Sequence, residues 1–147
     1  MYKINISSRT LHFLRPAGTS RGVYTTRKSY YVTLSDTNQP DVVGIGECAT
    51  LPDLSCDAMT DEEYEQKLRS FCDDFCHTGV IDIAAMRPYP SMLFGLETAK
   101  AQLEAKGSIN FFNTPFGRGE EGITINGLVW MGTFDEMYRR LEEKLRA

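Results

Sequence analysis

The cysteines and one histidine are the residues whose spacing first suggests chemistry. Cys72 and Cys76 lie four residues apart with His77 beside them, so on a helix the two thiolates would share one face. Thiolate and imidazole bind zinc, but a structural zinc takes four ligands, and Cys48 and Cys56 do not supply a second close pair. Free cysteine is also among the most buried residue types. A metal site and core packing both stay open, and the missing ligands favour packing.

Three other patterns suggest chemistry but have a structural explanation. Glu47 ends a predicted strand beside a loop, and no second acid or base is spaced to act with it. Gly44 and Gly46 lack the third glycine and the following helix of a dinucleotide-binding turn. The acids within residues 61–65 belong to the first turn of a predicted helix, where negative charge favours the helix dipole. None of these patterns predicts a catalytic site.

The first fifty residues have the alternation that positions side chains on a sheet. Apolar residues alternate with polar ones from Tyr2 to Arg15. Residues 16–22 interrupt the pattern with turn formers, residues 23–34 form a second run rich in Val, Tyr and Thr, and residues 42–47 form a third. Three strands joined by short loops predict an antiparallel meander.

Two helices are predicted after the strands. Thr60 and Glu63 have the spacing of a capping box, and Gly79 is a natural end for the first helix. The second helix is predicted to begin near Pro90 and to end at Gly107. The apolar stripe of the first helix is formed by Tyr64, Leu68, Phe71 and Phe75.

The C-terminal part reads as the beginning of a second domain. Residues 117–122 are rich in glycine and charge, which is typical of a linker. Residues 123–131 are apolar through much of their length, as in a parallel strand buried on both faces. Thr133 and Glu136 repeat the capping-box spacing and predict a helix to the chain end. Because a lone βα unit cannot bury its strand, we expect it to be the truncated start of a larger α/β domain.

The composition is that of an ordinary globular protein. The chain has 147 residues, of which 41% are hydrophobic and 24% charged, and its net charge is −4. This charge gives no basic surface for nucleic acid. The N-terminus lacks the apolar core of a signal peptide, and no segment approaches the ~20 apolar residues that cross a bilayer. We therefore expect a cytoplasmic protein that binds neither nucleic acid nor membrane.

Four segments, in the correct order, resemble one family. Residues 44–52 (GIGECATLP) are similar to the third strand and following loop of the enolase-superfamily capping domain, and residues 89–99 (YPSMLFGLETA) to its helix. Residues 125–132 (INGLVWMG) resemble the entry strand of the family's barrel. Together with residues 21–27 (RGVYTTR), the pattern is most similar to o-succinylbenzoate synthases, within the muconate lactonizing enzyme-like subgroup.

The resemblance implies an α+β fold with three parts. Residues 1–116 would be the capping domain, a three-stranded antiparallel meander followed by a helical bundle. Residues 117–122 would be a linker, and residues 123–147 the first strand and helix of a truncated (β/α)₇β barrel, the chain's own partner domain.

The resemblance also implies a reaction. Family members use Mg²⁺ to dehydrate 2-succinyl-6-hydroxy-2,4-cyclohexadiene-1-carboxylate to 2-succinylbenzoate in menaquinone biosynthesis, with a barrel Lys-x-Lys motif supplying the base and barrel carboxylates holding the metal. No Lys-x-Lys occurs in this sequence. We therefore expect catalytic and metal-binding residues to lie beyond Ala147, this chain to bind no cofactor, and this chain alone to be inactive.

In the family, two loops of the cap select the carboxylate substrate, and they correspond here to residues 17–22 and 51–57. Two interpretations of Arg21 stay open, a pair with a substrate carboxylate and a solvated loop arginine. The leucines of the second loop are expected to form an apolar wall, the alternative being packing against the barrel rim. The candidate substrate-binding residues are Thr19, Ser20, Arg21, Leu51, Pro52 and Leu54.

Two other functions stay open. The first is the cap of an N-acylamino acid racemase or dipeptide epimerase of the same superfamily, whose differing chemistry would lie in the barrel. The second is a non-catalytic binding module, against which the predicted barrel strand at residues 123–131 argues. An uncovered apolar strand also pairs readily with others, so we expect the chain to self-associate through the segment from Ile123 onward.

Overall fold

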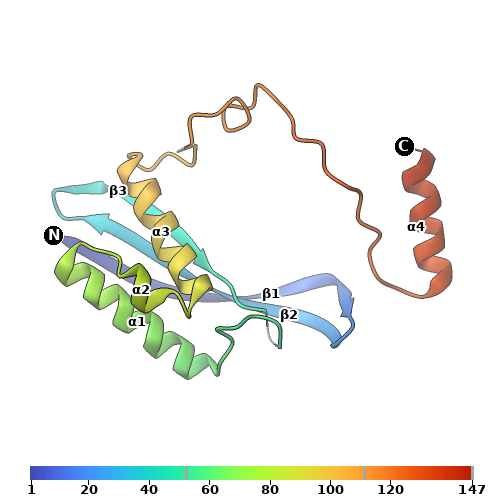
Figure 1. Cartoon of the computed structure of the whole chain (residues 1–147), viewed down its shortest axis with the longest axis horizontal. Coiled ribbons are helices and arrows are strands. Elements are labelled where there is room, and N and C mark those ends of the chain that lie inside the picture. The colour runs from blue at the N-terminus through green and yellow to red at the C-terminus, as the bar shows by residue number, and fades with distance from the viewer. Residues whose placement is uncertain (52, 111, 147) are drawn as a thin grey trace.

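A three-stranded sheet, helices on one of its faces and a separate C-terminal arm make up the molecule (Figure 1). The computed structural model describes residues 1–51, 53–110 and 112–146. The elements are β1 (Tyr2–Thr19), β2 (Gly22–Asp36), β3 (Gln39–Cys48), α1 (Asp61–Thr78), α2 (Ile83–Met86), α3 (Pro90–Glu104) and α4 (Phe134–Arg146).

The sheet is the predicted antiparallel meander, in the order β1-β2-β3. The pairing of β1 with β2 runs from Tyr2 opposite Asp36 to His12 opposite Thr26, and it resumes after an irregularity with Ala17 opposite Tyr24. The expected loop over residues 16–22 is therefore wrong in extent, because most of it continues the hairpin. A bulge explains how Pro16 is accommodated, since a proline has no N–H to give to a regular ladder.

The core lies between one sheet face and the helices α1 and α3. Val32 and Leu34 of β2 are fully buried, as are Leu68 of α1 and Leu96 of α3. The predicted stripe of α1 faces this core, although Phe71 is only partly buried. Within the described residues, the buried apolar side chains of this core are Tyr30, Val32, Leu34, Cys48, Tyr64, Leu68, Cys72, Phe75, Met86, Met92, Leu96 and Ala99.

Glycines allow α3 to lie directly on β3. A Cβ at Gly46 would fall 1.7 Å from the carbonyl oxygen of Gly95, and one at Gly44 would fall 1.9 Å from the carbonyl oxygen of Ala99. A Cβ at Gly95 would meet the Cys48 sulfur at 2.2 Å. The Gly-x-Gly pattern of β3 thus serves close backbone packing of a helix on a strand.

Both predicted capping boxes form. At α1, the Glu63 amide donates to Thr60 Oγ1 at 3.3 Å, and the Thr60 amide donates to Glu63 Oε2 at 3.1 Å. The helix ends at Gly79, whose φ of 71° is the left-handed cap that glycine favours. At α4, the Glu136 amide donates to Thr133 Oγ1 at 3.4 Å, and the Thr133 amide donates to Glu136 Oε2 at 2.9 Å.

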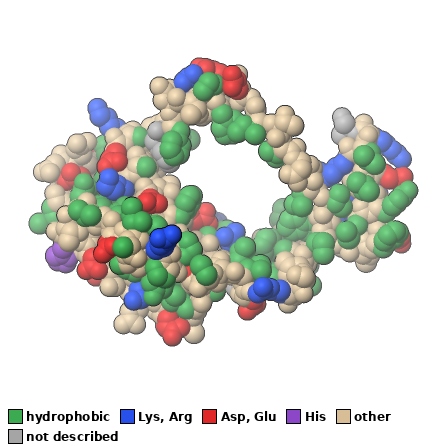
Figure 2. Space-filling view, in the orientation of Figure 1, with side chains coloured by type: hydrophobic (Ala, Val, Ile, Leu, Met, Phe, Trp, Pro, Cys, Tyr) green, Lys and Arg blue, Asp and Glu red, His purple; other side chains and the backbone are tan. Residues whose placement is uncertain are grey.

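The C-terminal arm, residues 117–146, differs from the prediction in one element. The strand expected over residues 123–131 is wrong: these residues have no strand structure, although α4 forms as expected. A parallel strand needs a neighbouring strand to take its backbone hydrogen bonds, and no described segment pairs with this one. Figure 2 shows hydrophobic side chains along this arm beside α4. The exposed ones are Ile123, Ile125, Leu128, Met131, Phe134, Tyr138, Leu141 and Leu145.

Candidate functional site

The two loops that the sequence singled out lie together beyond one end of the meander. A guanidinium N–H of Arg21 in the β1–β2 turn donates to the backbone carbonyl of Asp53. The hydroxyl of Tyr24 on β2 donates to Asp53 Oδ2 at 3.4 Å. Residues more than twenty positions apart are thereby joined across the gap between the hairpin and the second loop.

Hydrogen bonds within each loop define its shape. In the β1–β2 turn, Thr19 Oγ1 donates to the Gly22 carbonyl at 3.1 Å and accepts the Arg21 amide at 3.2 Å. In the second loop, the Leu51 amide donates to Ser55 Oγ at 2.9 Å, and the Ser55 amide donates back to the Leu51 carbonyl at 3.0 Å. Both turns are therefore closed by their own side chains, which is the role of short hydroxyl residues in turns.

Asp57 anchors the second loop to the core. Its side chain is only 2% exposed, and its Oδ2 accepts the amide of Ser91 at 2.8 Å and the Ser91 hydroxyl at 2.6 Å. Ser91 lies in the first turn of α3, where the helix dipole favours a carboxylate. The Tyr64 hydroxyl lies 2.6 Å from Ser91 Oγ, and burial raises the pKa of this phenol far above its usual range.

An apolar cavity lies between the two loops. Its volume is about 100 Å³, and side chains from the hairpin face leucines from the second loop across it. Almost no polar surface lines it, so it suits a hydrocarbon group rather than a charged one. The lining residues are Phe13, Ala17, Thr19, Tyr24, Thr26, Arg27, Leu51 and Leu54.

The structure brings most of the predicted site residues together. Thr19, Leu51 and Leu54 line the cavity, and Arg21 lies at the contact between the loops. Ser20 is exposed in the turn, and Pro52 lies outside the described residues. Arg21 is exposed, but it is not a free loop arginine, because it is bonded to Asp53.

Sequence reasoning missed the strand residues that line the cavity and two acids of the second loop: Phe13, Tyr24, Thr26, Arg27, Asp53 and Asp57. Tyr24 and Phe13 read as ordinary strand residues, and nothing in the alternation pattern separates them from their neighbours. Asp53 has a φ of 63°, in the left-handed region that few residues other than glycine, asparagine and aspartate adopt. An aspartate in the loop segment from Leu51 to Leu54 is the only sequence signal for this backbone conformation, and it is a weak one.

Two of the four cysteines are core residues, whereas Cys56 is exposed and Cys76 is partly buried. Cys48 and Cys72 are buried, and burial raises the pKa of each thiol to about 12. His77 shares a hydrogen bond of 2.7 Å with the Asp73 carbonyl through Nδ1. Among residues 1–51, 53–110 and 112–146, no group of three or more His, Cys, Asp or Glu side chains is arranged to hold a metal ion. The described residues therefore do not fit a Mg²⁺ site.

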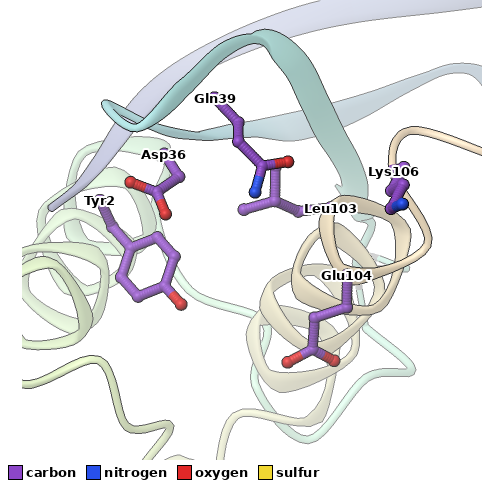
Figure 3. A pocket seen from close by; sticks show the side chains of 6 residues that line it. All are labelled: Tyr2, Asp36, Gln39, Leu103, Glu104 and Lys106. Carbon is purple, nitrogen blue, oxygen red and sulfur yellow. The ribbon is translucent and has the colours of Figure 1, made fainter.

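A second, more polar pocket lies away from the two loops, beside the β2–β3 turn and the end of α3 (Figure 3). Its volume is about 210 Å³. The chain's N-terminal ammonium pairs with Asp36 at 3.2 Å, and the Asn38 amide and this ammonium lower the pKa of the Asp36 carboxyl. The lining residues are Tyr2, Asp36, Gln39, Leu103, Glu104 and Lys106, none of them a predicted site residue.

Comparison with known proteins gives one curated relative and several related folds. No family model matches the sequence. The chain is 32% identical to the o-succinylbenzoate synthase of Desulfotalea psychrophila, over 92% of this chain and 44% of that protein. The crystal structure of MenC from the same organism matches 97% of this chain and 46% of its own, with a TM-score of 0.60 and 25% identity. We assign the chain to the enolase superfamily.

The superfamily assignment explains the architecture. An enolase family member from Agrobacterium tumefaciens with homology to dipeptide epimerases has the same fold, with a TM-score of 0.70 and 16% identity over 97% of this chain and 43% of its own. The sheet and the helices after it therefore form an enolase-superfamily capping domain of α+β class. The chain spans about half the length of the relatives that it matches.

Within the described residues, no helix is both long enough and apolar enough to cross a membrane.

Proposed function

We propose that this chain is the substrate-capping part of an o-succinylbenzoate synthase, a Mg²⁺-dependent lyase that dehydrates 2-succinyl-6-hydroxy-2,4-cyclohexadiene-1-carboxylate to 2-succinylbenzoate in menaquinone biosynthesis. The observation that carries the proposal is the meeting of the two predicted loops around an apolar cavity, with the Arg21 guanidinium at the contact between the loops. Similarity to the Desulfotalea psychrophila synthase over 92% of the chain supports the choice of reaction.

The residues of the two loops have separable tasks in this proposal. Arg21 uses one N–H on the Asp53 carbonyl, and a guanidinium has five donors, so the same group can also hold a substrate carboxylate. Leu51 and Leu54 cover the apolar part of the substrate and exclude water from it. In the complete enzyme, Mg²⁺ bound by the barrel would stabilise the negative charge that develops on the substrate carboxylate.

The test is a chimera. Residues 1–147 of this chain replace the matching part of the Desulfotalea psychrophila synthase, and Mg²⁺-dependent dehydration is measured. We expect an active chimera, and Arg21→Ala to lower kcat/KM by roughly 10- to 100-fold, because a hydrogen-bonded charge pair is lost. Asp41→Ala, an exposed acid near the opposite end of β3, is the matched control and should change little. A folded chimera that does not dehydrate this substrate would contradict the proposal.

A second activity within the superfamily has one observation in its favour, the fold shared with the Agrobacterium tumefaciens protein homologous to dipeptide epimerases. Likeness at 16% identity supports the fold alone. The two activities separate when the complete gene product is offered both substrates: epimerisation of dipeptides or racemisation of N-acylamino acids, without dehydration, would favour the second. A product with neither activity would favour a non-catalytic binding module.

The proposal includes the domain organisation and location expected from the sequence. Residues 1–116 would form the cap, residues 117–122 the linker and residues 123–147 the start of the barrel, which would be the cap's partner. All four cysteines are free thiols, and a cytoplasmic location would keep them reduced.

The exposed arm suggests that the chain of 147 residues self-associates. Tyr138 and Leu141 of α4 are both exposed on this arm, and clustered exposed apolar side chains favour association. Light scattering with size-exclusion chromatography should give a mass above that of one chain, and Leu141→Glu should lower it. A monomer at every concentration would contradict this expectation.

A further inference from the structure

We infer that Asp53 is a positioning residue that fastens the second loop to the hairpin and thereby sets the width of the apolar cavity between them. The inference concerns two cross-loop contacts, one through the backbone carbonyl of Asp53 and one through its carboxylate. Its meaning for substrate selection rests on the proposed function, but the contacts themselves can be tested without any substrate.

The backbone of Asp53 makes both contacts possible. At a φ of 63°, its carbonyl accepts from Arg21 while its side chain accepts from Tyr24. Aspartate tolerates the left-handed region better than most residues, although glycine adopts it more freely. A non-glycine residue keeps such a conformation when its surroundings hold it there, and here two side chains of the hairpin do so.

The contacts control the cavity because of where they lie. Leu51 and Leu54 flank Asp53 and form one wall, while Thr19 and Tyr24 belong to the other wall. The Asp53 contacts therefore join the two walls at the outer end of the loop, whereas Arg27 Nη2, which donates to the Ala49 carbonyl at 3.4 Å, joins the hairpin to the chain before the loop.

The inner end of the second loop is held independently. Asp57 is bonded to Ser91 at the start of α3 and is buried, so that end moves only with the core. Asp53 is exposed and belongs to the outer end. Loss of its contacts should release Leu51, Asp53 and Leu54 from the hairpin and leave Asp57 in place, which widens the cavity without unfolding the domain.

The first experiment measures backbone order in this chain by ¹⁵N relaxation. Asp53→Ala removes the carboxylate and disfavours the left-handed backbone, whereas Asp53→Gly removes the carboxylate and favours that backbone. In the unchanged chain we expect order parameters near 0.8 at residues 51, 53 and 54, falling below ~0.6 in Asp53→Ala. Asp53→Gly should stay close to the unchanged chain, since its carbonyl still accepts from Arg21.

Two further variants complete the relaxation experiment. Tyr24→Phe should lower the order of the second loop less than Asp53→Ala does, because only the 3.4 Å bond is lost. Asp41→Ala should leave it unchanged. Equal order in the unchanged chain and Asp53→Ala, or a loop already disordered without any substitution, would overturn the inference.

The second experiment uses the chimera with the Desulfotalea psychrophila synthase and separates this inference from the proposed function. Asp53→Ala should raise KM about tenfold and change kcat less than about threefold, and Asp53→Gly should restore KM, because positioning of substrate and not the chemical step is lost. An inactive chimera would contradict the proposed function and leave the relaxation result to decide the inference. An active chimera in which Asp53→Ala leaves KM unchanged would overturn it.

Discussion

Two regions of the molecule carry similar sequence signals but differ in the burial of their apolar side chains. One is the meander with α1 and α3, and the other is the C-terminal arm. Each has a run of apolar residues followed by a helix with a Thr-x-x-Glu capping box, and both boxes form. In the first region the apolar side chains are buried against one another, whereas in the arm most of them are exposed, and the arm meets the hairpin through Trp130, whose Nε1 donates to the Pro16 carbonyl at 3.2 Å. Local signals therefore suffice to build a helix in both regions, but burial depends on whether another element covers its apolar face.

Two phenylalanines, one in each region, allow the difference in burial to be measured. Phe75 of α1 is 1% exposed and Phe134 of α4 is 81% exposed. Phe75→Ala should lower the free energy of unfolding by about 3–5 kcal/mol, because it leaves a cavity in the core, whereas Phe134→Ala should change it by less than ~0.5 kcal/mol. Urea denaturation followed by circular dichroism measures both. A large loss with Phe134→Ala would mean that the arm is packed in solution.

The two regions should also differ in how pH affects their stability, because the buried thiols lie in the core and no cysteine lies in the arm. Burial raises the pKa of Cys48 and Cys72 from 9.0 to about 12, so the thiol form is favoured in the folded chain. Their stability contribution is complete below pH 9, where folded and unfolded thiols are both protonated. It is lost between pH 9 and about 12, where the unfolded chain releases protons that the folded chain keeps.

At pH 10 this loss should be about 1 kcal/mol for each thiol. The measurement is urea denaturation at pH 8 and pH 10, for the unchanged chain and for Cys48→Ala with Cys72→Ala. The double variant should lose less stability between the two pH values. Equal losses would show that the two thiols do not cause the dependence.

The smallest expected difference between the two regions is the effect of removing their capping boxes. Thr60→Ala should lower the free energy of unfolding by about 1 kcal/mol, because α1 is part of the core and an amide at its start loses its acceptor. Thr133→Ala should reduce the helix content of α4 and leave the main unfolding transition in place, since α4 contributes no buried residue. Chemical shifts of the α4 backbone, set beside the denaturation curve, distinguish the two. A shifted main transition in Thr133→Ala would show that α4 contributes to the stability of the core.

Much of the fold could be read from the sequence, because its signals are local. Alternation from Tyr2 onward, the helical stripe through Leu68 and the Thr60–Glu63 spacing each act within a few residues, and each gave the element expected. The same holds for the helix after Thr133. The strand at residues 123–131 was wrong for the complementary reason, since a strand is completed by a neighbour and not by its own residues.

The site was only half predictable from the sequence. Leu51, Leu54 and Arg21 were identified through resemblance to a family, whereas Tyr24 and Asp53 were not, although they join the two loops. In the sequence, Asp57 cannot be distinguished from other loop acids. Its role follows from the hydrogen bond that it accepts from Ser91 of α3.

The sequence by itself determined the helices α1, α3 and α4 and the two capping boxes, because the interactions that specify them span at most a few residues. Only the tertiary structure decided which apolar side chains of the arm stay exposed, that Arg21 meets Asp53 and that Asp57 anchors the second loop. These contacts join residues about thirty positions apart, and their geometry depends on how the sheet twists and where the helices pack against it.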